Sequence, residues 1–205
     1  MPKIEYFVNS DLEIKKKKII EACLMIVDKY GIKGATTARI AKEVGVVESA
    51  LYRHFPSKKE IFLQILKETY EIFESIIEEV EKMETDSLNK LTIILEKQLD
   101  FLKQYPGLIR IVYSDEIYKR DEEFLSKLNT FLNSLIERIE NIIREGVKKN
   151  IIKPDVDLSV AALNFLGIIQ ISLSYWAIKN RKIYPSLIGN KLLSFFFDGI
   201  KPNSI

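Results

Sequence analysis

The stretch GATTARIAKEVGVVESALYRHFPSKKE, residues 34–60, decides the fold of this chain. Its first part predicts a helix that opens at Thr36 or Thr37 and ends at Gly45. That helix has three apolar positions on one face, namely Ile40, Ala41 and Val44. A second helix follows, and its buried stripe consists of Val46, Ala50 and Leu51. Two helices joined by a short turn containing glycine form a helix-turn-helix, whose second helix enters the major groove of DNA.

The sequence of this segment resembles the DNA-binding domain of the TetR family of bacterial transcriptional regulators. The matching pieces are Gly34, Thr36-Thr37, Ile40-Ala41, Gly45-Val46, Leu51-Tyr52, His54-Phe55 and Ser57-Lys58. Upstream, three further pieces resemble the family's first helix and its end, namely Ile19-Ile20, Ala22 and Tyr30-Gly31. The motif match covers residues 14–66, and beyond it the resemblance is one of length and helical pattern.

The resemblance implies which residues meet DNA. Hydroxyl and basic side chains around the motif are expected to contact the backbone, since both kinds donate to phosphate oxygens. These residues are Lys18, Thr36, Thr37, Tyr52, His54 and Lys58. The exposed start of the second helix is expected to read base edges through Glu48, Ser49 and Ala50. Lys18 ends a run of four lysines that begins at Lys15, which is either a solvated helix start or a phosphate contact.

The segment departs from the family pattern at two positions. Val47 replaces the small hydroxyl residue that often opens the second helix, so the cap must come from elsewhere. Glu48 stands where a lysine is frequent. A glutamate there can accept from cytosine N4, although it repels phosphates. We hold two interpretations open: Glu48 reads a C·G pair, or it faces water and favours the helix dipole.

Charge is distributed unevenly along the chain. The 205 residues include 31 Lys or Arg and 29 Asp or Glu, for a net charge of +2. Residues 1–60 hold 12 basic residues against 8 acidic ones, and the remainder holds 19 against 21. The basic excess therefore lies in the segment expected to bind DNA, as attraction to phosphate requires.

Catalytic and metal-binding patterns are missing from the sequence. Cys23 is the single cysteine, so no intramolecular disulfide forms, and its apolar neighbours predict a buried side chain. His54 is the single histidine and has no second ligand for a metal set. Neither a nucleophile elbow nor a phosphate-binding glycine loop is found. We therefore expect a protein that is not an enzyme, with no metal and no cofactor.

The rest of the chain is predicted to be helical, because no segment alternates with period two. An apolar stripe predicts a helix from Ser57 to about Met83, with Glu60 completing a capping box. Further helices are expected over residues 86–105, 108–119, 121–149, 157–180 and 185–200. The fold class is all-α. It comprises an arm (1–12), a three-helix helix-turn-helix domain (13–60) and a larger helical domain for effector binding and dimerisation (61–205).

The segment Leu158–Ile178 contains no charged residue and is long enough to span a bilayer. Five polar side chains interrupt it, and no other segment is comparably apolar, so a helix buried between protein neighbours is preferred to a membrane span. Leu187–Phe197 is similarly apolar. The resemblance implies that these last two helices pair with their copies in a homodimer. Without a signal peptide at the N-terminus, the expected location is the cytoplasm.

An effector pocket is expected in the C-terminal region, because the family usually holds one there. The candidate lining residues are Phe101, Tyr105, Arg110, Tyr113, Tyr118, Phe131, Tyr175 and Trp176. Aromatic cavities with scattered hydroxyls suit flat or hydrophobic ligands. The aromatic residues also fit an ordinary core, and Arg110 is either a carboxylate partner or a surface residue.

The sequence thus predicts a DNA-binding transcriptional regulator. In the favoured interpretation it is a homodimeric repressor that binds a near-palindromic operator on double-stranded DNA and is released by a small hydrophobic or aromatic effector. In the alternative, it is an effector-independent DNA-binding protein of the same fold that acts on the nucleoid or the division machinery.

Overall fold

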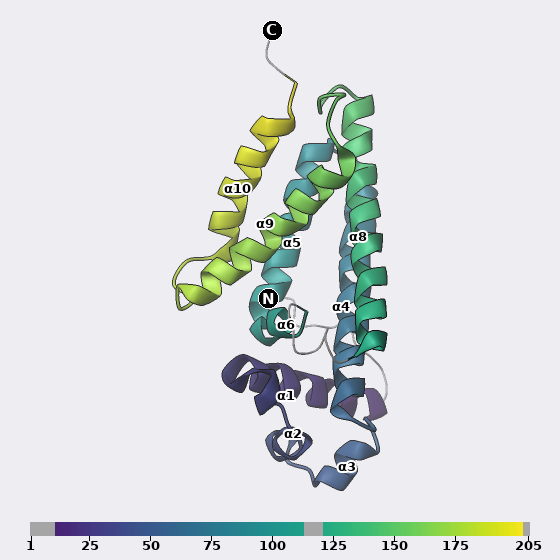
Figure 1. The fold of residues 1–205 in the computed structure, drawn as a ribbon, viewed down its shortest axis with the longest axis vertical. Coiled ribbons are helices and arrows are strands. Elements are labelled where there is room, and N and C mark those ends of the chain that lie inside the picture. The colour runs from purple at the N-terminus through teal and green to yellow at the C-terminus, as the bar shows by residue number, and fades with distance from the viewer. Residues whose placement is uncertain (1–10, 113–120, 203–205) are drawn as a thin grey trace. The chain divides into compact units, whose positions relative to one another are not determined.

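The structure is a computed structural model that describes residues 11–112 and 121–202 (Figure 1). All regular elements in these ranges are helices, so the predicted all-α class is confirmed. Their bounds are α1 Asp11–Gly34, α2 Thr37–Val44, α3 Glu48–Tyr52, α4 Lys58–Glu81, α5 Ser87–Gln104, α6 Pro106–Val112, α8 Glu122–Lys148, α9 Leu158–Ile178 and α10 Pro185–Ile200.

The helices pack into two compact units. The first unit groups Met1–Thr69 with Tyr105–Phe124, and the second groups Tyr70–Gln104 with Leu125–Ile205. Helix α4 contributes its first half to the first unit and its second half to the second. By packing, therefore, the segment after α5 belongs with the helices of the predicted DNA-binding domain. The functional boundary at residue 60 stays a prediction.

Helix α1 begins earlier than the sequence pattern suggested. Asp11 and Leu12, expected in a loose arm, already belong to it, so the lysine run from Lys15 lies past the first turn. The lysines therefore do not lie at the helix N-terminus, where their charge would oppose the helix dipole. One of them, Lys16, places its Nζ 5.9 Å from the ring centre of Phe55.

In the first unit, α1 packs against both α2 and α6, and α2 packs against α3. Helix α1 buries the apolar side chains of Ile19 and Val27, and Cys23 between them is 0% exposed. Leu51 of α3 is equally buried. These contacts fix the outward face of α3, which carries the residues expected to meet DNA.

In the second unit, α10 packs against α9 and α5, and Figure 1 shows these three helices side by side. Helices α4 and α8 are joined by Arg138, which bonds to Glu74 and to Glu81. Helix α10 lies close to α5 at Gly189, where a Cβ would come within 2.8 Å of Leu99 Cδ1. Helix α5 is also joined by ion pairs to α4, through Lys97 and Glu79, and to α8, through Lys90 and Glu145.

Helix α9 is the one described helix long and apolar enough to cross a membrane. Two of its polar side chains bond to carbonyls of the same helix: Ser172 donates to the Ile168 carbonyl at 2.6 Å, and Asn164 donates to the Val160 carbonyl at 2.8 Å. Asp157 accepts from the Val160 amide at 3.0 Å and caps the helix. Its packing on α5 and α10 agrees with the expected bundle helix.

Candidate nucleic-acid interface and effector region

The turn between α2 and α3 has the geometry that the sequence predicted. Thr36 caps α2 by accepting from the Arg39 amide at 3.2 Å. Gly45 ends the helix at φ 79° and ψ 30°, a left-handed conformation that glycine adopts without strain. The Val46 amide then bonds back to the Ala41 carbonyl at 2.9 Å. The helix-turn-helix geometry is confirmed.

Helix α3 presents the predicted base-reading residues. Glu48 and Ser49 are exposed, and Ala50 is half-buried above the anchored Leu51. Val47 precedes the helix without a side-chain capping bond, as its apolar side chain requires. The three residues are accessible to a base edge, and their readout stays a prediction.

Two predicted backbone contacts lie together at the surface, joined by a predicted base reader. The Thr37 hydroxyl donates to Oε1 of Glu48, and the Tyr52 hydroxyl lies 3.5 Å from the same oxygen. The Thr37 and Tyr52 hydroxyl oxygens are 3.3 Å apart. We call Thr37, Glu48 and Tyr52 the hydroxyl–carboxylate cluster. Glu48 and Tyr52 are four positions apart on α3, a spacing that places them on one helix face. This four-residue spacing is the feature of the sequence that indicates the contact between Glu48 and Tyr52.

The other predicted backbone contacts differ in their surroundings. Lys18 is exposed, whereas Thr36 is occupied as the α2 cap. Lys58 Nζ lies 3.4 Å from the Ile32 carbonyl oxygen and 5.6 Å from the ring centre of Phe62, so its ammonium group is partly held. His54 is half-buried, and its Nδ1 has no hydrogen-bond partner among the described residues.

Two of the predicted effector-pocket residues approach a common third ring. Phe101 of α5 and Phe131 of α8 both pack against Phe73 of α4, with ring centres 6.0 and 5.9 Å apart respectively. Tyr70 adds an edge contact to Phe131 at 5.3 Å. We call Tyr70, Phe73, Phe101 and Phe131 the aromatic cluster of the second unit. The apolar spacing that predicted α4 does not reveal the part that Phe73 takes in this cluster.

The remaining predicted pocket residues are dispersed. Tyr175 and Trp176 lie at the end of α9, where Lys179 and Arg181 lie over the Tyr175 and Trp176 rings respectively. Tyr105 is half-buried in the first unit. Arg110 is exposed, which favours the surface interpretation. Two further candidates, Tyr113 and Tyr118, lie outside the described residues.

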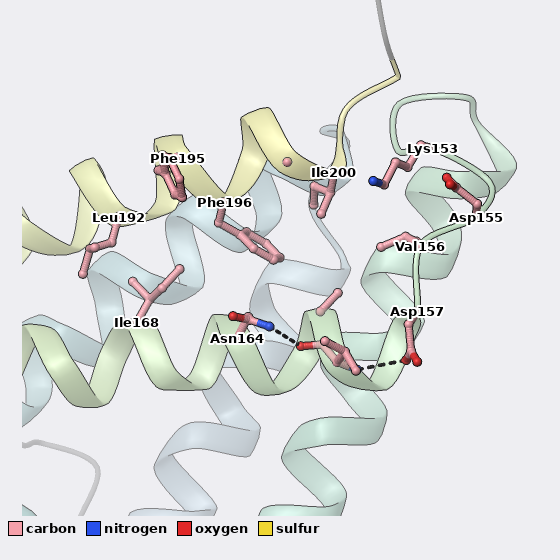
Figure 2. Close-up of a pocket in the computed structure, with 13 residues that line it drawn as sticks. Lys153, Asp155, Val156, Asp157, Asn164, Ile168, Leu192, Phe195, Phe196 and Ile200 are labelled. Atoms are coloured by element: carbon pink, nitrogen blue, oxygen red, sulfur yellow. Dashed lines mark hydrogen bonds between the residues drawn. The ribbon is translucent and has the colours of Figure 1, made fainter.

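A hollow of about 450 Å³ opens in the second unit between α9, α10 and the turn before α9 (Figure 2). Figure 2 shows Phe196 directed from α10 toward α9, with Lys153 and Asp155 on the turn at one end. The lining is mostly apolar, and Phe195 at its edge is 81% exposed. No predicted effector-pocket residue lines it.

Burial keeps the thiol of the single cysteine, Cys23, protonated. Removal from water raises the pKa of the Cys23 thiol from 9.0 to about 12, because burial disfavours the thiolate. The thiol therefore stays neutral at physiological pH, in agreement with the expected core role. In the described ranges, no three His, Cys, Asp or Glu side chains gather as metal ligands.

Two family models match the chain in succession. The model for bacterial regulatory proteins of the tetR family matches residues 19–65, and the model for the C-terminal region of YsiA-like protein matches residues 64–193. Together they cover the helix-turn-helix and nearly all of the helices that follow.

Whole-chain comparisons agree with these matches. The nucleoid occlusion factor SlmA of Vibrio cholerae is 31% identical over 177 residues, which span 84% of this chain and 88% of SlmA. The fatty acid metabolism regulator protein of Bacillus subtilis is 25% identical over 186 residues, which span 91% of this chain and 95% of that protein. The crystal structure of FadR from Bacillus subtilis in complex with stearoyl-CoA superposes with a TM-score of 0.76 at 23% identity, covering 90% of this chain and 98% of FadR.

Proposed function

Because this chain belongs to the TetR family of bacterial regulatory proteins, we propose that it is a homodimeric repressor released from its operator by a long-chain acyl-CoA. The family is one of DNA-binding transcriptional regulators, so DNA is the target of α2 and α3. The identity of the effector, the dimer and the sign of regulation are the parts that we propose.

The DNA-binding part of the proposal is supported by the exposed hydroxyls of Thr37 and Tyr52. They lie beside the start of α3, where a duplex in contact with that helix presents its phosphates. The predicted base readers Glu48 and Ser49 are exposed on the same short helix. Phosphate contacts set the position of the protein, and the exposed face of this helix supplies the readout.

An acyl-CoA effector is supported by the relatives and by the interior of the second unit. FadR of Bacillus subtilis was crystallised with stearoyl-CoA, and the similar regulator from that organism is named for fatty acid metabolism. The aromatic cluster around Phe73 offers apolar surface of the kind that an acyl chain prefers. The effector must bind the DNA-incompetent state more tightly than the DNA-bound state, since a ligand shifts an equilibrium only by its differential affinity.

A second copy completes the proposed repressor. Helix α9 exposes an apolar stripe that includes Val160, Leu163, Ile171 and Ile178. Gly167 lies in the same stripe with nothing within 4 Å of a Cβ built on it, so another helix has room to approach. Phe195 of α10 is exposed at the edge of the hollow, and a second copy would cover it. A two-fold dimer then presents two recognition helices to half-sites about 34–36 Å apart.

Selection of DNA from a random pool tests the repressor proposal, with Tyr52→Ala as the control, at low and at near-physiological salt. A near-palindromic site that survives the higher salt and is lost in the control is the expected result. Stearoyl-CoA is then titrated into the protein–operator complex, with free coenzyme A as the matched control. Release by stearoyl-CoA alone is expected, whereas retention at saturating stearoyl-CoA would reject the proposed effector.

A second candidate function is favoured by the similarity to SlmA, which is a nucleoid occlusion factor. An effector-independent protein of this kind would bind specific DNA and ignore acyl-CoA. The titration above separates the two functions without further assumptions. Both place the protein in the cytoplasm on DNA, and neither requires a catalytic residue.

A further inference from the structure

The exposed carboxylate of Glu48 lies beside the hydroxyls of Thr37 and Tyr52, where a DNA phosphate is expected to bind. Its Oε1 accepts the hydrogen bond from Thr37 and lies 3.5 Å from the Tyr52 hydroxyl. Thr37 and Tyr52 are the two hydroxyl residues proposed to hold the DNA backbone. In the DNA-free protein, these donors therefore already meet an anionic oxygen of their own chain.

Carboxylate and phosphate oxygens are equivalent acceptors for a hydroxyl. A threonine hydroxyl has one proton, so Thr37 cannot donate to Glu48 and to a phosphate at once. Two anions at the same donors also repel each other. Neither a base reader nor a solvated helix-start residue, the two interpretations of Glu48 from its position in the sequence, requires this contact.

We propose that Glu48 is an internal competitor of the DNA phosphate: its carboxylate holds Thr37 and Tyr52, and DNA binds only by displacing it. The inference rests on the proposed phosphate contacts of these two hydroxyls. Because every sequence offers the same phosphates, the competition lowers affinity for all DNA alike. Glu48 then sets the strength of binding, whereas a base reader would set the preference at one base pair.

The first test compares dissociation constants for the selected operator and for a random duplex by fluorescence anisotropy. Glu48→Ala is expected to bind both duplexes about tenfold more tightly, the change that about 1.4 kcal/mol produces. Glu48→Gln keeps an acceptor oxygen without the charge, so its gain is expected to be smaller. Glu43→Ala, which removes another exposed carboxylate in the first unit, is the matched control and is expected to change affinity least.

A double-mutant cycle separates competition from simple charge repulsion. In a Thr37→Val, Tyr52→Phe background, Glu48→Ala is expected to gain much less affinity than in the wild type, because only the charge repulsion is left to relieve. An equal gain in the two backgrounds would overturn the proposal, and so would an unchanged affinity of Glu48→Ala in the wild-type background. Loss of preference at a single base pair in Glu48→Ala would instead assign the base-reading role.

A further comparison tests whether Thr37 and Tyr52 contact phosphates at all, separately from the competition by Glu48. In the Glu48→Ala background, replacing both hydroxyls must weaken binding if Thr37 and Tyr52 hold phosphates. Unchanged affinity in that comparison would reject the contacts themselves, separately from the competition. The cluster is at the surface, and thermal unfolding followed by circular dichroism verifies that each variant is folded.

Discussion

Gly107 of α6 lies against the backbone of α1 at Leu24. A Cβ atom built on Gly107 would come within 2.0 Å of the Leu24 carbonyl oxygen, so no side chain fits at this position. The two helices are far apart in the chain but adjacent within the first unit. The contact joins α6 to α1, which in turn packs against α2. A shift of α6 would therefore displace the DNA-binding helices.

Gly107→Ala is expected to destabilise the protein, because the new methyl group meets backbone atoms that cannot rotate away. Overpacking of this kind costs about 1–3 kcal/mol. Thermal or urea unfolding measures the loss. Gly199→Ala is the matched control, since nothing lies within 4 Å of a Cβ at that position. Equal stability of the two variants would show that α6 does not pack on α1 this closely.

Phe195→Asp is expected to convert the dimer to a monomer. Phe195 is 81% exposed in the single chain, and a charge there cannot be buried against a second copy without a large cost. Sedimentation equilibrium measures the association. Leu125→Asp places the same charge at an exposed leucine of α8 and is expected to leave the dimer intact. Dimers of normal affinity in Phe195→Asp would move the interface away from α10.

Gln98→Leu is expected to stabilise the protein. Gln98 is 1% exposed, and neither atom of its amide group has a hydrogen-bond partner among the described residues. Such a group costs about 1–3 kcal/mol, and leucine of similar volume avoids that cost. The midpoint of urea unfolding should rise. A fall would show that the amide is paired in solution.

Ser87→Ala is the control for Gln98→Leu, because Ser87 is also buried on α5 with an unpaired oxygen. Both variants should gain stability, because each removes a buried polar group that has no partner among the described residues.

Cys23 is expected to make the protein less stable in alkali. Its pKa is raised from 9.0 to about 12 by burial, so above pH 9 the unfolded thiol ionises while the folded thiol keeps its proton. The folded state then binds more protons, and stability falls as pH rises from about 9 toward 12. Cys23→Ala should reduce this slope in urea unfolding at pH 8 to 10. A slope equal to that of the wild type would show that Cys23 ionises normally when folded.

The thiol should also be protected from alkylation. Iodoacetamide requires the thiolate, and Cys23 is both neutral and 0% exposed in the folded protein. Modification at pH 8 is expected only after unfolding in urea. Rapid labelling of the native protein would show that α1 opens readily.

The sequence by itself determined the local structure. The helix start at Thr36 or Thr37, the stop at Gly45 and the inability of Val47 to cap were predicted, because each depends on residues within one turn. Most of the helices follow from apolar spacing, which also depends on near neighbours. The family followed from the same short segment.

Only the tertiary structure decided which distant residues meet. The bond from Thr37 to Glu48 crosses the turn between two helices, and it changes how Glu48 is interpreted. The packing of Gly107 on Leu24 and of Phe101 and Phe131 around Phe73 depends on the path of the chain. Helical periodicity shows which face is apolar, but it does not show which other face will cover it, because that is selected by the packing of all the helices together.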